Sequence, residues 1–201
     1  IVSSPPLFTG AIGLFLNFFR REKYWLDIRD LWPESALQLE QINNGIFYKF
    51  GKILESLIYR YAEGFIFPVP GFKLYLSHLP KVISKKPMHT LMNGVSKEFI
   101  QKSAQLNHPS TKNFTVLYSG NMGLAQDLKT IVEAASLLKK YDINFRFIGN
   151  GVCKNEIQSL SKPLSKTISF LDPMERDKII KEIKQSSVCL VPLKNKKIFK
   201  N

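Results

Sequence analysis

Cysteine is scarce in this sequence, and its scarcity excludes two kinds of architecture. Only Cys153 and Cys189 occur among the 201 residues. Two isolated cysteines form neither the disulfide framework of a small secreted domain nor the clustered thiolates of a structural zinc site. We therefore expect reduced thiols in a cytoplasmic protein.

Long hydrophobic runs are also lacking. The apolar run from Leu7 to Phe19 is shorter than the roughly 20 residues that a membrane-spanning helix needs. The basic pair Arg20 and Arg21 follows this run, whereas in a signal peptide it would precede it. We therefore expect a soluble or peripheral protein. The chain starts with Ile1 rather than Met, and its last stretch, from Lys194 to Asn201, directly follows a strand-like run with nothing to pack it, so we expect truncation at both ends.

Acidic residues are few, 16 against 29 basic ones, which gives a formal net charge of +13. The excess favours polyanionic partners: nucleic acid, an anionic membrane surface or phosphorylated substrates. No known nucleic-acid-binding module is recognisable, and aromatics do not interleave with a basic stripe. The plain alternative is solubility charge scattered over helix surfaces.

Short apolar runs alternate with longer stretches of helical period, which predicts a doubly wound α/β fold with parallel sheets. The predicted strands are 24–28, 64–69, 89–92, 115–119, 144–148, 167–170 and 188–192. Helical spacing of apolar residues predicts helices over 45–61, 128–138 and 176–184. A polar stretch, 100–113, indicates a domain boundary.

The segment from Asp27 to Ser35 begins at the end of a predicted strand and carries unusual chemistry. Asp27 and Asp30 flank Arg29, and a tryptophan and a proline follow. Because ligands gather at the carboxyl ends of parallel strands, this cluster is typical of a site that orients a substrate hydroxyl or holds a general base. The structural alternative is a local salt bridge beside a helix that opens at Pro33.

Two glycine-containing turns follow strands in the second half, at 120–123 and 149–151. Glycine at a strand-to-helix turn lets backbone N–H groups approach a phosphate. Each turn alone is a weak signal because Gly-Asn and Asn-Gly are ordinary turn dipeptides. Together they favour a nucleotide site, although neither matches the dinucleotide fingerprint or the P-loop.

The motifs at 3–6, 27–34, 93–95, 118–123 and 147–151 occur in an order that resembles the group 1, family four glycosyltransferases. Within that family the sequence is most similar to the branch that assembles bacterial capsule and O-antigen sugars, which includes L-fucosamine transferases. The resemblance covers essentially the whole chain, and the Arg-Asp-Leu-Trp-Pro-Glu block, 29–34, is its most distinctive part.

The resemblance implies the GT-B architecture, an α/β fold of two Rossmann-like domains, both incomplete here. Residues 1–98 would be the C-terminal part of the acceptor-side domain, 99–113 a linker, and 114–201 the first part of the nucleotide-sugar-binding domain. It implies catalytic or acceptor-side roles for Asp27, Arg29 and Asp30. The implied donor-binding and hinge residues are Gly120, Asn121, Met122, Gly149, Asn150, Gly151 and Asp172, with Asn93 and Gly94 at the hinge and cleft.

The reaction implied by the resemblance is the transfer of a sugar from a nucleotide-sugar, UDP-linked and N-acetylated, to a lipid-linked or saccharide acceptor. It would serve bacterial surface polysaccharide synthesis, retain anomeric configuration, and need neither a protein-held metal nor a cofactor besides the nucleotide-sugar co-substrate. The implied location is cytoplasmic and peripheral, on the inner face of the plasma membrane. No nucleic acid partner is implied.

Two departures from the family pattern qualify this reading. Asn121 and Gln126 stand where many relatives place an Arg and a Lys that grip the diphosphate, which leaves Lys129, Lys154 and backbone N–H groups to balance its charge. The family's paired glutamates would fall beyond Asn201, and the glycine-rich loop of the first domain is missing. We therefore expect this chain to be inactive alone.

Membrane contact is predicted from aromatic and basic residues mixed in two helical stretches. They are Phe15, Phe18, Phe19, Arg20 and Arg21 in the first, and Tyr48, Lys49, Phe50, Lys52, Tyr59 and Arg60 in the second. Such mixtures suit a lipid interface, but they equally fit aromatics that face a sheet between solvated basic flanks. Two other functions stay open: a sugar-nucleotide epimerase of the same architecture and a basic nucleic-acid-binding module.

Overall fold

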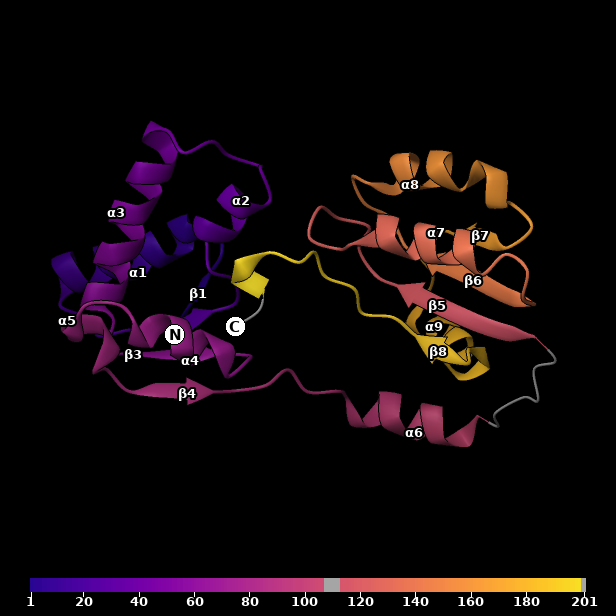
Figure 1. Cartoon of the computed structure of the whole chain (residues 1–201). Coiled ribbons are helices and arrows are strands. Elements are labelled where there is room, and N and C mark those ends of the chain that lie inside the picture. Colours follow the sequence, from indigo (N-terminus) through magenta and orange to yellow (C-terminus); the bar gives the residue numbers. More distant parts are fainter. Residues whose placement is uncertain (107–112, 200–201) are drawn as a thin grey trace. The chain divides into compact units, whose positions relative to one another are not determined.

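The computed structural model describes residues 1–106 and 113–199, which form two compact units. The first comprises Ile1–Gly94 and the segment that begins at Asn195, and the second comprises Val95–Lys194. Each unit contains one sheet of parallel strands whose connections run through helices (Figure 1). The predicted α/β fold is therefore confirmed.

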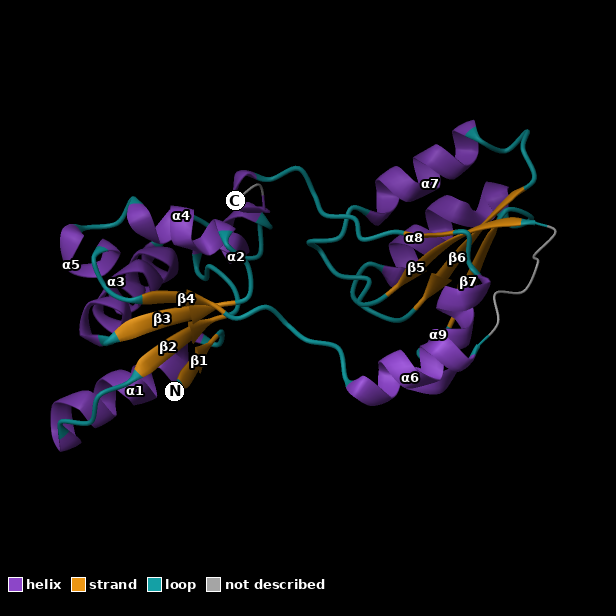
Figure 2. Cartoon of the chain, turned by 90° about the horizontal axis from the view of Figure 1, so that it is seen from below, coloured by secondary structure: helices purple, strands orange, loops and turns teal. Residues whose placement is uncertain are grey.

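The sheet of the first unit has the strand order β1-β2-β3-β4 (Figure 2). Its strands are β1 (Val2–Ser4), β2 (Trp25–Ile28), β3 (Gly64–Phe67) and β4 (Met88–Thr90). Its helices are α1 (Leu7–Arg20), α2 (Glu34–Gln38), α3 (Ile46–Tyr61), α4 (Gly71–Ser77) and α5 (Lys81–Ser84), with the short helix η2 (Lys197–Phe199). Strand β1 is absent from the sequence prediction because its three residues form no apolar run.

The core of the first unit lies between the two central strands and α3. Leu26 and Ile28 on β2, Phe65 and Phe67 on β3, and Ile58 on α3 are fully buried. Strands covered on both faces are apolar at successive positions rather than at alternate ones. This explains why short continuous apolar runs located β2 and β3 correctly.

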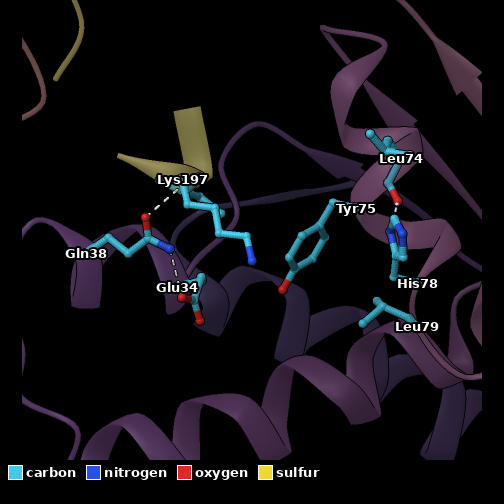
Figure 3. A pocket seen from close by; sticks show the side chains of 8 residues that line it. Glu34, Gln38, Leu74, Tyr75, His78, Leu79 and Lys197 are labelled. Atoms are coloured by element: carbon cyan, nitrogen blue, oxygen red, sulfur yellow. Dashed lines mark hydrogen bonds between the residues drawn. The ribbon is translucent and has the colours of Figure 1, made fainter. Parts of the chain in front are cut away.

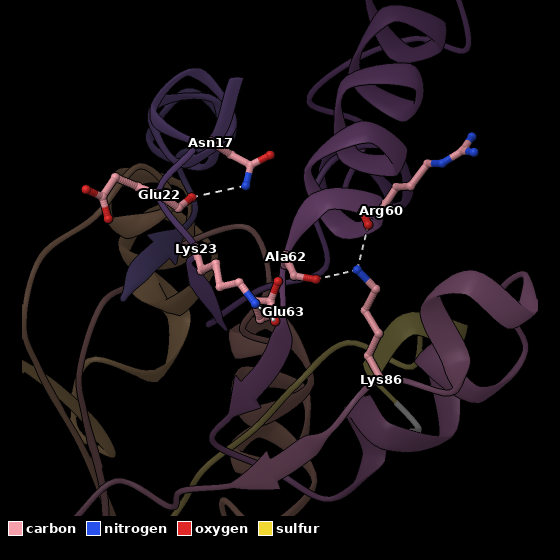
Figure 4. A network of polar contacts seen from close by, with 7 residues as sticks. All are labelled: Asn17, Glu22, Lys23, Arg60, Ala62, Glu63 and Lys86. Carbon is pink, nitrogen blue, oxygen red and sulfur yellow. Dashed lines mark hydrogen bonds and ion pairs between the residues drawn. The ribbon is translucent and has the colours of Figure 1, made fainter. Parts of the chain in front are cut away.

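Lys86 closes the C-terminal end of α3 (Figure 4). Its Nζ donates hydrogen bonds to the carbonyl oxygen of Arg60, at 2.5 Å, and to that of Ala62. The last carbonyls of a helix have no partner within it, and positive charge is favoured at that end. Burial lowers the pKa of the Lys86 ammonium, and the nearby Glu63 carboxylate acts in the opposite direction.

Replacing this lysine should destabilise the first unit. Lys86→Met leaves two carbonyl oxygens without a charged donor, so we expect the free energy of unfolding to fall by about 1–2 kcal/mol. Both tryptophans, Trp25 and Trp32, lie in this unit, so their fluorescence during guanidinium unfolding reports on it. Lys85→Met, at an exposed neighbouring side chain, is the control. Equal unfolding midpoints for the two variants would contradict the capping role.

The sheet of the second unit has the order β7-β6-β5-β8. Its strands are β5 (Phe114–Ser119), β6 (Ile143–Ile148), β7 (Ile168–Leu171) and β8 (Val188–Cys189). Its helices are α6 (Lys97–Gln105), α7 (Leu128–Leu137), α8 (Lys154–Ser161) and α9 (Arg176–Gln185), with the short helix η1 (Lys162–Leu164). Strands β6 and β7 are added on one side of β5, whereas β8 lies on its other side. Ligands of open α/β sheets bind where the direction of strand addition reverses in this way.

The structure differs from the predicted linker, 99–113. Helix α6 occupies most of its first part and packs against α9 within the second unit. The helix forms because Ser96 Oγ accepts a hydrogen bond from Phe99 N and caps its start. Lys102 Nζ then pairs with Asp177 of α9 at 2.9 Å. Residues 107–112 lie outside the described part of the chain.

Among residues 1–106 and 113–199, no helix combines the length and the apolar character that crossing a membrane requires.

Candidate functional site

The predicted strand-end cluster is assembled in the first unit from three strands. Ser3 of β1 lies in register with Asp27 of β2, and its Oγ donates to Asp27 Oδ2 at 3.0 Å. Arg29 Nε donates to the same oxygen at 2.7 Å. The Arg29 guanidinium also donates through Nη1 to Asn93 Oδ1, which follows β4, at 2.6 Å. Three sequence motifs therefore meet in one hydrogen-bonded chain.

Within this series of hydrogen bonds, the buried Asp27 and the exposed Arg29 have different surroundings. The Asp27 carboxylate is covered, and Ser3 and Arg29 satisfy one of its oxygens. Such a carboxylate holds the guanidinium in place, while the exposed part of Arg29 stays available to an anionic group. Asp27 is thus placed to position Arg29. Ser3 lies in the 3–6 motif, to which no role could be assigned from the sequence.

Asp30 takes no part in that series of hydrogen bonds, although it is only one residue away from Arg29. Its Oδ2 accepts a hydrogen bond from Ser35 Oγ in α2 at 2.9 Å, and its side chain is half-buried. Gly94, the second predicted hinge residue, is exposed, and a Cβ there would meet no atom within 4 Å.

A cavity of about 390 Å³ lies beside residues 29–34, between α2, α4 and η2. It is lined by Glu34, Gln38, Leu74, Tyr75, His78, Leu79, Lys197 and Ile198. Figure 3 shows that the carboxylate of Glu34, the hydroxyl of Tyr75 and the ammonium of Lys197 point toward one space. Apolar walls with a few convergent polar groups are typical of small-molecule sites. Sequence reasoning missed this cavity because α4 and η2 were not predicted.

Glu34 is the anionic group of this cavity. Burial raises its pKa, but hydrogen bonds from Tyr48 and Gln38 lower it. The positive charges of Lys52 and Lys197 act in the same direction, so that the pKa lies below its ordinary value. The bond from Tyr48 Oη measures 2.6 Å and that from Gln38 Nε2 measures 3.0 Å. Glu34 is therefore an ionised acceptor at neutral pH.

A buried polar network continues from the cavity into α3. Lys52 Nζ pairs with Glu55 and also donates to Tyr75 Oη at 3.4 Å. Burial raises the pKa of the Glu55 carboxyl, and Lys52 counteracts this only in part. Among the described residues, Glu55 Oε1 is the only buried side-chain oxygen or nitrogen without a hydrogen-bond partner. A buried polar atom in this condition is costly.

The two glycine turns of the second unit lie side by side at the ends of β5 and β6. Gly149 has a φ of 140° and Gly151 a φ of 153°, in the region that favours glycine. A Cβ on Gly149 would lie 2.0 Å from the carbonyl oxygen of Gly120. One on Gly151 would lie 2.5 Å from that of Met122. The turns approach each other so closely that only glycine fits at both positions.

These turns line a pocket of about 330 Å³ at the carboxyl ends of β5, β6 and β7. Its lining residues are Ser119, Gly120, Asn121, Ile148, Gly149, Asn150, Pro173, Met174 and Ile179. Four predicted donor-site residues are among them. Met122 is not, since its side chain is fully buried in the core of the unit.

Most of the backbone N–H groups expected to approach a phosphate already have partners within the protein. Those of Gly120, Met122 and Gly149 donate to the carbonyl oxygens of Ile148, Asn150 and Leu171 at 3.0, 2.8 and 3.1 Å. Gln126 Oε1 accepts from Gly123 N at 3.1 Å, and Tyr118 Oη donates to Asn121 O at 2.6 Å. The turn residues therefore give the pocket its shape. Tyr118 and Gln126 support it in ways that the sequence did not reveal.

Asp172 lies next to the pocket, one residue before Pro173. The exposed Asp172 carboxylate accepts a hydrogen bond from Lys154 Nζ at 2.6 Å, and this bond lowers its pKa. Lys129, the other expected source of positive charge, faces Glu133 at 4.0 Å. Of the two lysines, Lys154 is held near the pocket and Lys129 belongs to the surface of α7. Within the part of the chain that the structure describes, no group of three or more His, Cys, Asp or Glu side chains is placed to hold a metal ion.

Residues 98–197 match the family model described as Glycosyl transferases group 1. The match extends over nearly the whole second unit, which is therefore similar in sequence to the group 1 glycosyltransferases. Comparison with curated proteins finds no match.

Solved structures of similar fold cover both units. A sucrose-phosphate synthase from Thermosynechococcus elongatus aligns with a TM-score of 0.70 and 18% identity, over 93% of this chain and 48% of that one. HepE from Anabaena in complex with UDP-glucose gives 0.63 and 14%, over 93% and 51%. The lipopolysaccharide outer core galactosyltransferase WaaB gives 0.51 and 13%, over 92% and 55%. The chain thus spans about half the length of these structures, and its fold is that of GT-B glycosyltransferases, as the resemblance implied.

Proposed function

We propose that the full-length protein is a retaining glycosyltransferase of the branch that includes the L-fucosamine transferases. It moves a sugar from a UDP-linked, N-acetylated donor to a lipid-linked or saccharide acceptor in bacterial surface polysaccharide synthesis. The observation that carries the proposal is the second-unit pocket at the carboxyl ends of β5, β6 and β7, within the segment that matches the family model. HepE, whose fold is similar, was crystallised with UDP-glucose, which supports the choice of donor.

On the donor side, the pocket residues Gly120 and Asn121 lie beside the diphosphate, and Gly149 and Asn150 lie near the nucleotide. Gly151, the next residue, belongs to the same turn. Met122 contributes through its backbone, which holds Asn150 in place, rather than through its buried side chain. The turn at Asp172 contacts the base through main-chain groups. Lys154 supplies positive charge at the edge of the pocket when its bond to Asp172 opens.

On the acceptor side, Asp30 orients or deprotonates the acceptor hydroxyl, and Arg29, held by Asp27, contacts an anionic group of the acceptor. Asn93 and Gly94 form the hinge at the boundary of the first unit.

The nucleotide-sugar is the co-substrate, and no metal or further cofactor takes part. The protein acts at the cytoplasmic face of the plasma membrane as a peripheral protein and has no nucleic acid partner. The chain from Ile1 to Asn201 is inactive by itself.

Calorimetry on the full-length protein tests the donor assignment. We expect UDP to bind at millimolar concentration or below, and GDP and ADP to bind more weakly because main-chain groups around Asp172 select the base. Asn121→Asp, which places a negative charge beside the diphosphate in a pocket-lining side chain, should weaken UDP binding roughly tenfold. Failure to bind UDP while another nucleotide binds would overturn the choice of uridine.

A further inference from the structure

Helix α1 presents a line of large apolar side chains to the outside of the first unit. Phe8, Ile12, Phe15 and Phe19 recur with helical spacing, and each is between 56% and 75% exposed. The opposite side of α1 is the packed one, where Leu7, Gly10 and Gly13 are buried. Within the first unit as described, the exposed apolar line of α1 therefore lies opposite the side that packs into the core.

Helix α3 repeats this arrangement next to α1. Ile46, Phe47, Phe50, Ile53 and Leu57 are between 39% and 82% exposed, whereas Gly51, Glu55, Ile58 and Tyr59 face the interior. Tyr48 and Lys52 are also engaged inside, with Glu34 and Glu55. Of the aromatic and basic residues predicted to meet a membrane, Tyr48, Lys52 and Tyr59 therefore belong to the interior of the unit.

The two apolar lines join into one surface, which we call the α1–α3 face. The helices contact each other, since a Cβ on Gly10 would lie 2.9 Å from Ile58 Cδ1 (Figure 1). At their C-terminal ends the rings of Phe18 and Tyr61 lie 5.1 Å apart between centroids. Exposed apolar surface of this extent on a folded unit is typical of an interaction site.

The exposed charges on the two helices of the α1–α3 face are positive. They are Arg20, Lys49 and Arg60, and the exposed Arg21 and Glu22 follow directly after α1. The only acidic residue within α1 and α3, Glu55, is buried and paired with Lys52. A partner that complements this face must therefore offer both an apolar layer and negative charge.

We propose that the α1–α3 face binds an anionic phospholipid surface. Its apolar side chains enter the boundary between headgroups and acyl chains, while Arg20, Arg21, Lys49 and Arg60 meet the lipid phosphates. A second copy of this chain fits less well, because a two-fold pairing of the face would bring like charges together. The proposal rests on the peripheral location proposed above and does not depend on the sugar-transfer chemistry.

Flotation of the full-length protein with vesicles tests this proposal. We expect binding to vesicles of equal parts phosphatidylcholine and phosphatidylglycerol, little binding to phosphatidylcholine alone, and weaker binding as salt is added. Phe8→Ser with Phe19→Ser and Phe47→Ser should lower the partition coefficient at least about tenfold. Arg20→Glu with Arg60→Glu should do the same through charge.

The controls are matched substitutions at exposed positions of the second unit. Leu137→Ser removes an apolar side chain from α7, and Lys139→Glu with Lys166→Glu reverses two charges. Both should float like the unchanged protein. Tryptophan fluorescence reports the folding of the first unit in every variant, because both tryptophans lie there. UDP calorimetry separates the proposals, since flotation without any UDP binding would remove the donor assignment and leave the lipid surface standing.

Three results would overturn the proposal. They are the absence of flotation at low ionic strength, equal loss of binding in the control variants, and a concentration-dependent dimer in sedimentation that the Phe8, Phe19 and Phe47 substitutions abolish. The last result would assign the α1–α3 face to a second copy of the chain.

Discussion

Asp30→Asn in the full-length enzyme lowers turnover by about a hundredfold or more, provided that this carboxylate orients or deprotonates the acceptor hydroxyl. The amide is nearly the same size and keeps an oxygen that can accept the hydrogen bond from Ser35 Oγ. The loss should therefore appear in kcat, measured as UDP release with saturating acceptor, and not in the melting temperature.

Ser35→Ala separates catalysis from local structure at this position. It removes the hydrogen bond to Asp30 but leaves the carboxylate, so we expect a lower melting temperature with kcat reduced by no more than about tenfold. A reversed pattern, in which Asp30→Asn lowers the melting temperature and leaves the rate unchanged, would show that Asp30 serves only to fix α2.

Gly149→Ala should destabilise the second unit by about 3 kcal/mol or more and abolish UDP binding. The new Cβ would lie 2.0 Å from the carbonyl oxygen of Gly120, and the φ of 140° is unfavourable for any other residue. The Gly120 loop must move away, and this opens the pocket that both turns line. Differential scanning calorimetry and UDP titration of the full-length protein measure the two effects.

The matched control is Gly45→Ala, just before α3, where a Cβ would meet nothing within 4 Å and φ is −113°. We expect it to keep both the melting temperature and the affinity for UDP. If Gly149→Ala behaves in the same way, the close approach of the two turns does not govern the donor pocket.

The positions of the strands could be predicted because buried parallel strands are apolar at successive residues, as in Phe65 to Phe67 and Val116 to Tyr118. Strand β1 could not, since Ser3 and Ser4 resemble a turn. Strand β8 ends at Cys189, although the apolar run continues to Pro192. The pairing of β8 with β5 covers only Val188 and Cys189, and the apolar pattern does not indicate where this pairing stops.

The candidate site was predictable where its residues follow strands, and less so where partners come from elsewhere in the chain. Asp27 and Gly149 were located from strand ends alone. The link from Arg29 to Asn93 joins residues 64 positions apart, and nothing local in the sequence marks such a pair. Likewise α3 carries apolar and aromatic residues on both its buried and its exposed side, so its sequence does not reveal that Tyr59 is inside and Phe50 outside.

The bond between Arg29 and Asn93 has a consequence for how the first unit ends. Asn93 is anchored by a charged partner, and the next residue, Gly94, has open space around its Cα. The last anchored side chain in the Ile1–Gly94 part of the first unit therefore stands two residues before Val95, where the second unit starts. Any ligand that draws the Arg29 guanidinium away from Asn93 would release this anchor. Ligand binding at the strand-end cluster would in this way act on one of the two connections between the units, the other being the step from Lys194 to Asn195.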